Sequence, residues 1–538
     1  MKVPQERPWF KVWPRKIPKT LEYPNVPLYR FLKDSAEKHP DKIAIDHERD
    51  QISYEELDAL SDKLAGALAD LNVQKGNSVS IFLPNIPEFT ISYYAILKAG
   101  GVVAPVNPLS KEIELNHTLS NSDARTMIAH ESLYPIVRNV QRGAALENVI
   151  IVGQRRRQNT YRFRDLITKH APQPFQTKIR PKQDVAVIQC TGGTTGTPKG
   201  VMLTHYNLIS NAIMNAHWFG WSSEDVVLAV LPLYHSWGAS YMNSTVYIGA
   251  TLVPTTRFDP ESVLQLVEEK KVTVWYGAAT MFTLITNHPA LTKYNLSSLR
   301  CVKAGAAPIP NATKTRWDSL TGVELILGYG LTEASPETHN SPPRRVKIGS
   351  IGIPIIDTDA KIVDIETGTK ELPLGEAGEL IVKGPQIMKG YAKSPKETDK
   401  ALRNGWLYTG DIARMDAEGY FYIVDRLKDT IKYKGYSVHP AEVENALYTH
   451  PSIKECAVIG KPNPIAGEIP KAYIVLKKGA TTTKEELIEY CKEKISPYKR
   501  IREVEFVTEL PKNTAGKILR RTLRNDESHR KARQTYTT

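Results

Sequence analysis

An alternation of helical and strand-like segments near the N-terminus constrains the fold of this chain more than any other feature. Ser53 and Glu56 have the spacing of a helix capping box, and leucines then recur at helical spacing. Strand-like runs at residues 79–83 and 102–105 flank a second helical stretch at residues 88–98. Because strand–helix–strand order brings successive strands together in parallel, we expect an α/β fold with largely parallel sheets covered by helices.

Two later regions show different patterns. The chain has 538 residues, and a single core rarely grows past about 250–300 residues, so at least two domains are expected. Short alternating segments between Gly, Pro and Asp turns predict an antiparallel, barrel-like part at residues 348–424. This part belongs to a large N-terminal domain, residues 1–427. Residues 428–538 mix helical and strand-like segments and predict a small α+β C-terminal domain.

Composition excludes several classes of protein. The apolar share of 41% and the charged share of 24% are those of an ordinary globular protein. No stretch approaches the roughly 18 continuous apolar residues of a membrane-spanning helix. The four cysteines are widely spaced and form no C-x-x-C pair, so neither a zinc site nor a disulfide framework is expected. We therefore expect a cytoplasmic protein.

The net charge, 71 − 58 = +13, is compatible with nucleic acid, an anionic membrane face or small polyanionic substrates as partners. The basic residues are scattered, and the densest groups, at residues 155–164 and 517–533, are interpreted as a solvated loop and tail. No aromatic-plus-basic module is present, so no nucleic-acid partner is expected. This interpretation leaves open a weak peripheral membrane contact and a homodimer.

The most specific signal is the segment from Thr191 to Gly200, which reads TGGTTGTPKG after an apolar run. Glycines let backbone N–H groups approach phosphate oxygens, threonine hydroxyls add donors, and Lys199 adds positive charge. The segment is not a Walker loop, because Pro198 stands where that motif needs glycine. It predicts a loop that binds phosphate.

With this segment and several others in the same order, the chain resembles the adenylate-forming superfamily over residues 21–524. That superfamily includes fatty acid–CoA ligases, 4-coumarate–CoA ligase, firefly luciferase and peptide-synthetase adenylation domains. The resemblance implies an enzyme that activates an acid with ATP and Mg²⁺ and transfers the acyl group to coenzyme A. The residues that it implies for nucleotide and CoA binding are Thr191, Gly192, Gly193, Thr194, Thr195, Gly196, Thr197, Lys199, Gly305, Ala306, Ala307, Gly328, Tyr329, Gly330, Asp411, Arg426, Lys428, Lys432, Lys434 and Gly435.

Within the N-terminal domain, the resemblance assigns a role to each conspicuous side chain. Tyr329 stacks on adenine, Thr332 contacts the α-phosphate region, and Glu333 holds Mg²⁺ together with Thr191. The implied acid-binding residues are His235, Trp237, Gly305 and Gly330. His235 is not expected to act as a general base, because a carboxylate is already ionised at pH 7.

The C-terminal motifs are assigned in the same way. Asp411 accepts hydrogen bonds from the ribose hydroxyls, and Arg426 reaches the ribose or phosphate. Lys428 is the pivot of a mobile C-terminal domain, and the loop with Gly435, flanked by Lys432 and Lys434, lines the pantetheine tunnel. Lys517 bridges the acid carboxylate and the α-phosphate. The catalytic residues implied are Lys517, Glu333, Thr332 and His235.

The acid is expected to be a medium- or long-chain fatty acid, because residues 331–340 and 6–10 are most similar to prokaryotic fatty acid–CoA ligases. Three alternatives stay open: an aromatic or short or hydroxy acid, a carrier protein in place of CoA, and a nucleotide-binding scaffold without catalysis. Glu333, Asp411 and Lys517 are all present, which disfavours the scaffold. Luciferase-type oxidation is disfavoured further.

Overall fold

The computed structural model describes residues 7–48, 50–141, 146–172, 177–191, 198–307, 309–434, 436–463, 465–512 and 518–535. The chain divides into two compact units. The first contains residues Met1–Ala360, Val382–Tyr408 and Glu418–Tyr420, and the second contains Lys361–Ile381, Thr409–Ala417 and Phe421–Thr538. The second unit therefore includes segments that precede residue 428. The domain boundary at that residue stays a prediction.

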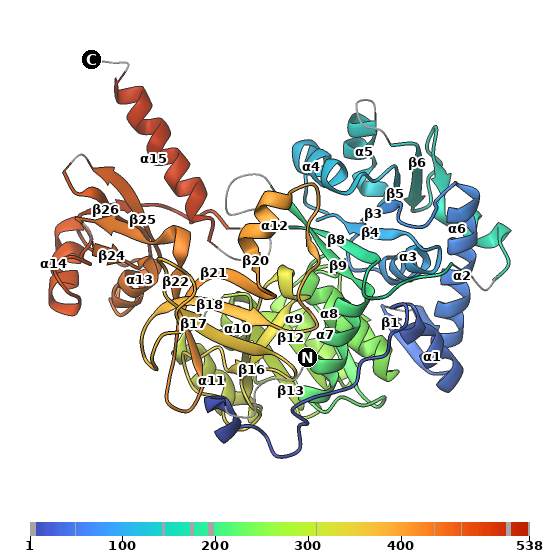
Figure 1. Ribbon diagram of the computed structural model, residues 1–538, viewed down its shortest axis with the longest axis horizontal. Helices are drawn as coiled ribbons and strands as arrows, with labels where there is room; N and C mark the ends of the chain where they lie inside the picture. Colours follow the sequence, from blue (N-terminus) through green and yellow to red (C-terminus); the bar gives the residue numbers. More distant parts are fainter. Residues whose placement is uncertain are drawn as a thin grey trace. The chain divides into compact units, whose positions relative to one another are not determined.

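An eight-stranded sheet forms one half of the first unit (Figure 1). Its order is β19-β9-β8-β4-β3-β5-β6-β7. The strands are β3 (Ser78–Phe82), β4 (Val102–Pro105), β5 (Thr126–His130), β6 (Asn148–Val152), β7 (Tyr161–Arg162), β8 (Val185–Thr191), β9 (Lys199–Thr204) and β19 (Gly390–Tyr391). Strands β3 to β8 run parallel, whereas β9 and β19 are antiparallel to their neighbours. The parallel α/β arrangement expected from the sequence is confirmed.

A nine-stranded sheet forms the other half of the first unit, with the order β16-β15-β14-β13-β12-β10-β11-β1-β2. Its strands are β1 (Ile43–His47), β2 (Asp50–Ser53), β10 (Val226–Ala229), β11 (Thr251–Pro254), β12 (Val274–Ala278), β13 (Cys301–Gly305), β14 (Leu325–Gly330), β15 (Glu337–Asn340) and β16 (Ile353–Pro354). Strands β14, β15 and β16 form an antiparallel edge on a parallel centre.

Helices α3 (Pro87–Lys98), α7 (His205–Trp218) and α8 (Ser236–Ile248) link the two sheets. Helix α3 packs on β3 and β4, α7 packs on β8 and β9, and α8 packs on β10, β11 and α7. Nearly every residue of the three helices is buried. The buried residues include polar ones such as Asn211, whose side chain bonds to the Glu337 carbonyl at 3.0 Å, as buried polar groups require. The other longer helices of this unit are α1 (Arg30–Lys38), α2 (Tyr54–Asp70), α4 (Glu112–Ser122), α5 (Tyr134–Gln141), α6 (Phe163–Lys169), α9 (Pro260–Glu269), α10 (Ala279–Thr286), α11 (Asn311–Thr321) and α12 (Pro395–Ala401).

The strands predicted at residues 348–424 are distributed over three sheets. Strand β16 pairs with β15 and β19 pairs with β9, both within the first unit. In the third sheet, β18 (Gly378–Lys383) lies between β17 (Asp359–Val363) and β21 (Trp406–Met415), and β22 (Phe421–Arg426) pairs with β21. Most residues of these four strands belong to the second unit. The β21–β22 pair is antiparallel, as the alternating pattern predicts.

The C-terminal part of the second unit has the α+β composition expected from the sequence. Its sheet has the order β24-β23-β26-β25, with β27 beside β26. The strands are β23 (Ile431–Tyr433), β24 (Tyr436–Val438), β25 (Ile453–Asn463), β26 (Gly467–Leu476) and β27 (Glu503–Phe506), and the helices are α13 (Pro440–Tyr448), α14 (Lys484–Lys494) and α15 (Arg520–Thr535). Side chains from β23, β25, β26, α13 and α14 share one apolar core.

Candidate active site

The two ends of the predicted phosphate loop lie side by side. Thr191 is the last residue of β8 and Lys199 is the first residue of β9, and the two are paired across the antiparallel β8–β9 ladder. Residues 192–197, which include the remaining glycines and threonines of the loop, lie outside the described residues. Strand β8 runs parallel to β4, so Thr191 stands at the carboxyl edge of the sheet, where open α/β sheets bind ligands.

The Lys199 ammonium is paired with the carboxylate of Glu397. Glu397 belongs to α12, and the ammonium also lies 5.0 Å from the centre of the Tyr391 ring. Glu397 also pairs with Lys400 at 2.8 Å. The hydrogen bond from Lys199 is the main cause that lowers the pKa of Glu397 to about 2. A cation at the end of a loop of this composition is well placed to exchange this carboxylate for a phosphate.

Glu333 lies beside the same tyrosine. It belongs to a short 3₁₀ turn, residues Thr332–Ala334, between β14 and β15. The Tyr391 hydroxyl donates a hydrogen bond of 2.9 Å to Glu333 Oε1, and the backbone N–H of Met388 donates to the Glu333 carbonyl at 2.8 Å. Tyr391 therefore contacts both Lys199 and Glu333, which the sequence places 134 residues apart.

A single carboxylate in this position fits Mg²⁺, which proteins commonly hold through one or two carboxylates together with substrate phosphates. Glu333 has the carboxylate that such a site requires, and Thr191 is the residue that the sequence predicts as its hydroxyl partner. Among the described residues, no group of three or more His, Cys, Asp and Glu side chains is arranged to bind a metal by itself. The arrangement is therefore suited to a metal that arrives with a nucleotide.

The glycines on either side of Tyr329 have a structural explanation. A Cβ atom on Gly330 would lie 2.2 Å from the Pro336 carbonyl oxygen, and one on Gly328 would lie 2.4 Å from Asn340 Oδ1. Both contacts come from the close pairing of β14 with β15. The Tyr329 ring stands edge-on to the His339 ring, with centroids 5.9 Å apart.

The loop after β13 is also strained. Ala306, which the family resemblance implies in nucleotide or CoA binding, has a φ of 65° and is exposed, whereas the preceding residue, Gly305, is buried at the end of β13. A left-handed non-glycine residue is uncommon and is found preferentially at functional sites. Ala307 is described beside it, half-buried.

His235 caps the N-terminus of α8. Its Nδ1 accepts a hydrogen bond of 3.3 Å from the Trp237 backbone N–H, and its own backbone N–H donates to the Pro232 carbonyl. Desolvation by burial lowers the pKa of His235 to about 4, so the ring is neutral at pH 7. Ser236, the next residue, lies 3.2 Å from Thr332 through their hydroxyl oxygens. The predicted acid and phosphate segments therefore meet at these two hydroxyls.

Trp237 is fixed by a buried polar network. Its indole N–H donates a hydrogen bond of 2.8 Å to Glu337 Oε1, and Glu337 also forms an ion pair with Lys303. Burial lowers the pKa of the Lys303 ammonium, and the neighbouring Glu337 carboxylate opposes that effect. A Cβ atom on Gly305 would lie only 2.7 Å from the Trp237 ring. The structure thus brings together two predicted acid-binding residues, Trp237 and Gly305.

In the second unit, Asp411 and Arg426 face each other across the β21–β22 ladder. The Arg426 Nε lies 2.9 Å from Asp411 Oδ1, and the Asp411 side chain is buried. Next to Arg426, burial raises the pKa of Asp425 to about 6, although the backbone N–H groups of Arg426 and Ala441 donate hydrogen bonds to it. A buried carboxylate held by an arginine is a suitable acceptor for ribose hydroxyls.

The remaining predicted CoA-binding residues are described only in part. Lys428 lies in the 3₁₀ turn Leu427–Asp429. The Lys432 backbone N–H donates to Glu468 at 2.8 Å, and the Lys434 ammonium lies 5.8 Å from the centre of the Tyr433 ring. Gly435 and Lys517 lie outside the described residues.

Sequence patterns missed four residues that organise this site: Tyr391, Glu397, Lys303 and Glu337. Tyr391 lies in a two-residue strand, and Glu397 lies in a short charged helix. Both Lys303 and Glu337 lie in buried strands. Lys303 interrupts the apolar and small-residue run of β13, whereas Glu337 begins β15, whose other residues are polar. Such an interruption is the one signal that identifies Lys303 in advance, because charged residues are almost never fully buried unless paired.

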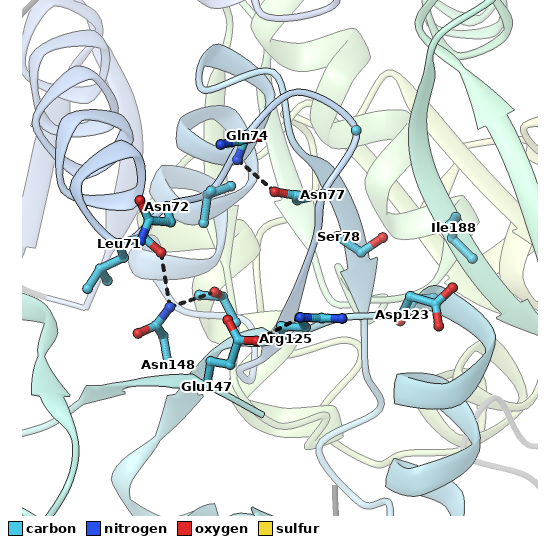
Figure 2. A pocket seen from close by; sticks show the side chains of 14 residues that line it. Leu71, Asn72, Gln74, Asn77, Ser78, Asp123, Arg125, Glu147, Asn148 and Ile188 are labelled. Carbon is cyan, nitrogen blue, oxygen red and sulfur yellow. Dashed lines mark hydrogen bonds and ion pairs between the residues drawn. The ribbon is translucent and has the colours of Figure 1, made fainter. Parts of the chain in front are cut away.

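A hollow of about 570 Å³ lies on the far edge of the eight-stranded sheet (Figure 2). Ser78, Thr126 and Asn148, which line it, are the first residues of β3, β5 and β6. It therefore lies at the amino edge of the parallel strands, whereas Thr191 ends β8 at the carboxyl edge. Polar side chains of its wall bond to one another, such as Arg125 to Glu147 at 2.8 Å. None of the predicted site residues that the structure describes lines this hollow.

Comparison with known proteins identifies the family. The sequence profile of AMP-binding enzymes matches residues 32–392, and that of the AMP-binding enzyme C-terminal domain matches residues 442–517. The chain belongs to the AMP-binding enzyme family. A protein of Bacillus subtilis (strain 168) named long-chain-fatty-acid–CoA ligase is 40% identical over 554 aligned positions, which cover 97% of this chain and 98% of that protein.

Other members of the AMP-binding enzyme family agree in sequence and in fold. A long-chain-fatty-acid–CoA ligase of Escherichia coli O6:H1 is 33% identical, over 96% of this chain and 98% of that protein. ATP-bound MatB from Rhodopseudomonas palustris superposes with a TM-score of 0.87 at 30% identity, covering 94% of this chain and 99% of that one. In the part of the chain that the structure describes, no helix is long and apolar enough to cross a membrane.

Proposed function

We propose that the protein is an ATP-dependent acid–CoA ligase that acts on a medium- or long-chain fatty acid. In the first step, the acid carboxylate attacks the α-phosphorus of ATP, pyrophosphate leaves, and an acyl-adenylate forms. In the second step, the CoA thiol attacks the acyl carbonyl, AMP leaves, and the thioester forms. The observation that carries the proposal is the family match over nearly the whole chain, joined to a site in which Tyr391 links Lys199 with Glu333.

In this proposal, the protein accelerates the first step mainly by positioning the reactants and by stabilising the charge on the phosphates. Lys199 leaves Glu397 and binds the departing phosphates. Glu333 and the Thr191 hydroxyl hold Mg²⁺, which neutralises charge on the phosphates when it is bound. Tyr329 stacks on adenine, and Thr332 contacts the α-phosphate region. Neutral His235 orients the acid without taking a proton, because a carboxyl group is ionised at pH 7.

The second unit supplies the other groups. Asp411 accepts hydrogen bonds from both ribose hydroxyls, with Arg426 beside it. Lys517 offsets the repulsion between the acid carboxylate and the α-phosphate. We further propose a large domain, residues 1–427, and a C-terminal domain, residues 428–538, that turns about Lys428. This motion exchanges Lys517 for the loop around Gly435, with Lys432 and Lys434 on either side, so that pantetheine reaches the adenylate.

The names of the relatives support a fatty acid as the substrate. Six of the similar proteins carry the name long-chain-fatty-acid–CoA ligase. An aromatic or short acid is the second candidate, and the observation that favours it is the Trp237 ring packed over Gly305. Proteins named 4-coumarate–CoA ligase are 32–34% identical to the chain, and a solved anthranilate CoA ligase is 28% identical.

Pyrophosphate release tests the proposal. The protein is incubated with ATP, Mg²⁺ and saturated acids of graded length, in parallel with aromatic acids, with and without CoA. We expect release with fatty acids and an acyl-CoA product by mass spectrometry. Release without thioester would show that CoA is not the acceptor and would favour the alternative of a carrier protein. No release with any acid would contradict the ligase proposal.

Location and assembly are proposals of the same kind. We place the protein in the cytoplasm, with ATP, CoA and the acid as its partners and no nucleic acid. A homodimer predicts twice the chain mass of 60.3 kDa in light scattering. A weak peripheral membrane contact predicts sedimentation with anionic vesicles at low salt and release at high salt.

A further inference from the structure

The Lys199 ammonium lies between a carboxylate and an aromatic ring that come from one short segment of the chain. It forms an ion pair with Glu397 and lies 5.0 Å from the centre of the Tyr391 ring. The Lys199 side chain is 18% exposed and that of Glu397 is 31% exposed. Glu397 also pairs with Lys400, whose side chain is 72% exposed. The carboxylate therefore bridges a half-buried ammonium at the end of the phosphate loop and an ammonium in solvent.

The position of Glu397 does not depend on its bond to Lys199. The next residue of α12, Thr398, fastens the helix to β19. Its hydroxyl accepts a hydrogen bond of 2.9 Å from the Tyr391 backbone N–H and donates one of 3.0 Å to the Ser394 carbonyl. Strand β19 in turn pairs with β9, the strand that Lys199 begins. If the Lys199 side chain turns toward a phosphate, the Glu397 carboxylate therefore stays beside it.

A carboxylate in this position weakens the binding of a phosphate in two ways. It competes for the same ammonium, because carboxylate and phosphate oxygens both accept charge-assisted hydrogen bonds. It also repels a phosphate group, because it is ionised at pH 7: the hydrogen bond from Lys199 is the main cause that lowers the pKa of Glu397 to about 2. Ion pairs between partly exposed side chains are weak, so the loss of phosphate affinity should be no more than about fivefold.

We propose that Glu397 promotes the release of pyrophosphate by competing with it for the Lys199 ammonium. This inference rests on the proposed function, in which Lys199 leaves Glu397 and binds the departing phosphates. While Lys199 binds the phosphates, Glu397 keeps Lys400 as its partner. When pyrophosphate departs, the Lys199 ammonium returns to a carboxylate that is already in place. Glu397 acts through Lys199 and is therefore a positioning residue, and its presence makes the protein bind pyrophosphate less tightly.

Four variants separate competition for Lys199 from other effects of the carboxylate. Glu397→Gln keeps the size of the side chain and an oxygen that accepts from Lys199, but it removes the charge. Lys199→Met removes the ammonium, and Lys199→Met/Glu397→Gln combines the two changes. Asp399→Asn is the matched control, because Asp399 is an exposed residue of the same helix, α12. It removes the same charge and reports the effect of net charge alone.

The experiment measures the binding of inorganic pyrophosphate with Mg²⁺ to each full-length protein by calorimetry, without acid or CoA. Glu397→Gln should bind pyrophosphate more tightly than native protein, with a Kd lower by up to about fivefold, and Asp399→Asn should bind it with the native Kd. In the Lys199→Met background, Glu397→Gln should leave the Kd unchanged, because the two residues act as one pair. Pyrophosphate should also inhibit thioester formation more strongly in Glu397→Gln than in native protein, by the same factor as the Kd.

The direction of the change in Glu397→Gln decides the inference. Weaker binding would mean that the carboxylate only orients Lys199 for the phosphates, and an unchanged Kd would mean that it does not compete; either result overturns the inference. An equal gain in affinity in Asp399→Asn, or in the Lys199→Met background, also overturns it, because the effect would then be one of net charge. These results leave the ligase proposal intact as long as native protein releases pyrophosphate with an acid. Native protein that releases no pyrophosphate with any acid overturns the proposed function itself.

Discussion

Single residues in this site owe their placement to partners that are distant in the sequence. Tyr391 bonds to Glu333 and lies over Lys199, and Glu397 neutralises Lys199. The cation and the anion that the proposed reaction needs are therefore each held by a side chain of the 390–397 segment. In the proposed function, phosphates of the nucleotide replace Glu397 as the partner of Lys199, whereas the Tyr391–Glu333 bond can persist.

The proposed role of Glu333 in binding Mg²⁺ leads to the first prediction. Glu333→Gln keeps the size of the side chain and an oxygen that accepts from Tyr391, but it removes the charge. Tyr391→Phe keeps the charge and removes the hydrogen bond that orients it. Loss of such an orienting partner typically costs about 10–100-fold in metal affinity. A magnesium titration of pyrophosphate release should therefore shift by about tenfold in Tyr391→Phe and by more in Glu333→Gln. An unchanged titration in Glu333→Gln would remove this residue from the metal site.

Buried histidines predict how stability depends on pH. His205 is 1% exposed, accepts a hydrogen bond of 3.1 Å from the Leu28 backbone N–H through Nδ1, and has a pKa that desolvation lowers to about 4. Its pKa in the unfolded chain is about 6.5. Above pH 6.5 both states are neutral and the full stability is present. As the pH falls from 6.5 toward 4, only the unfolded chain takes up the proton, so stability is lost in that window.

The variant His205→Asn tests this second prediction, because its amide oxygen can accept the same bond and does not titrate. One pKa unit corresponds to about 1.4 kcal/mol, so His205 should cost native protein about 2 kcal/mol between pH 7.5 and pH 5. Urea unfolding at the two pH values measures this loss. Between pH 7.5 and pH 5, the free energy of unfolding of His205→Asn should fall by about 2 kcal/mol less than that of native protein. His235 and His339, with pKa values lowered to about 4 and about 3, should keep part of the acid sensitivity in the variant. Equal losses in both proteins would contradict the assignment.

At the scale of elements, local patterns predicted individual helices and strands well. The Ser53–Glu56 capping box is present, and the helix that it begins, α2, buries Leu57, Leu64 and Leu68. The predicted strand at residues 79–83 is β3, shifted by one residue, and the predicted strand at residues 102–105 is β4. These features could be predicted because capping and periodicity act over a few neighbouring residues.

Pairing between elements could not be predicted in the same way. Nothing in the two residues of β19 indicates that they pair with β9, yet this pairing brings Tyr391 to Lys199. The Lys303–Glu337 pair joins β13 to β15 across β14. Periodicity shows which face of a strand is buried, but it does not show which strand lies opposite. The family motifs could therefore be recognised in the sequence, whereas the residues that hold their side chains in place could not be predicted from it.

The hairpin-like contact of β14 with β15 leads to the third prediction. Gly330 is expected from the sequence to bind substrate, but the structure gives it a packing role, because an added Cβ would meet the backbone of Pro336 at 2.2 Å. Gly330→Ala should lower the free energy of unfolding by about 1–3 kcal/mol, as overpacking does. Gly66→Ala is the control: Gly66 lies inside α2 with 3.5 Å to the nearest atom, so the change should stabilise by about 0.5–1 kcal/mol. A neutral Gly330→Ala in urea unfolding would leave binding as the reason for this glycine.

At the scale of the whole molecule, the order of motifs along the chain identified the family, whereas the pattern of helices and strands predicted only the fold class. The α/β class and the α+β C-terminal part were predicted from segment types, and the family was identified from motifs spread over the chain. The division into units was harder to predict from the sequence, because segments 361–381 and 409–417 belong with residues from 421 onward. Contacts between segments that are distant in sequence define a compact unit, and a linear pattern does not contain them.

The proposed exchange of two conformations leads to the last prediction, which concerns the division of labour between the half-reactions. Lys517→Ala removes the charge aimed at the reacting phosphate, and loss of one such preorganised group typically costs about 10²–10³ in rate. This variant should lose ATP–pyrophosphate exchange but still convert a supplied acyl-adenylate into thioester. Gly435→Leu should do the opposite, because a bulky side chain obstructs the pantetheine path. Lys428→Pro, which fixes φ at the pivot, should separate the two steps as well.

The control for Lys517 is Lys512, which lies five residues earlier in the chain and forms a partly exposed ion pair with Glu455 at 2.7 Å. Such a pair contributes at most about 1 kcal/mol to stability, so Lys512→Ala should carry out both half-reactions at nearly native rates. Exchange and thioester formation are measured separately on each variant, with acyl-adenylate supplied for the second step. If Lys517→Ala and Gly435→Leu impaired both steps equally, the proposed exchange of Lys517 for the loop around Gly435 would be contradicted. A single arrangement of residues would then have to serve both reactions, and the pivot assigned to Lys428 would have no function.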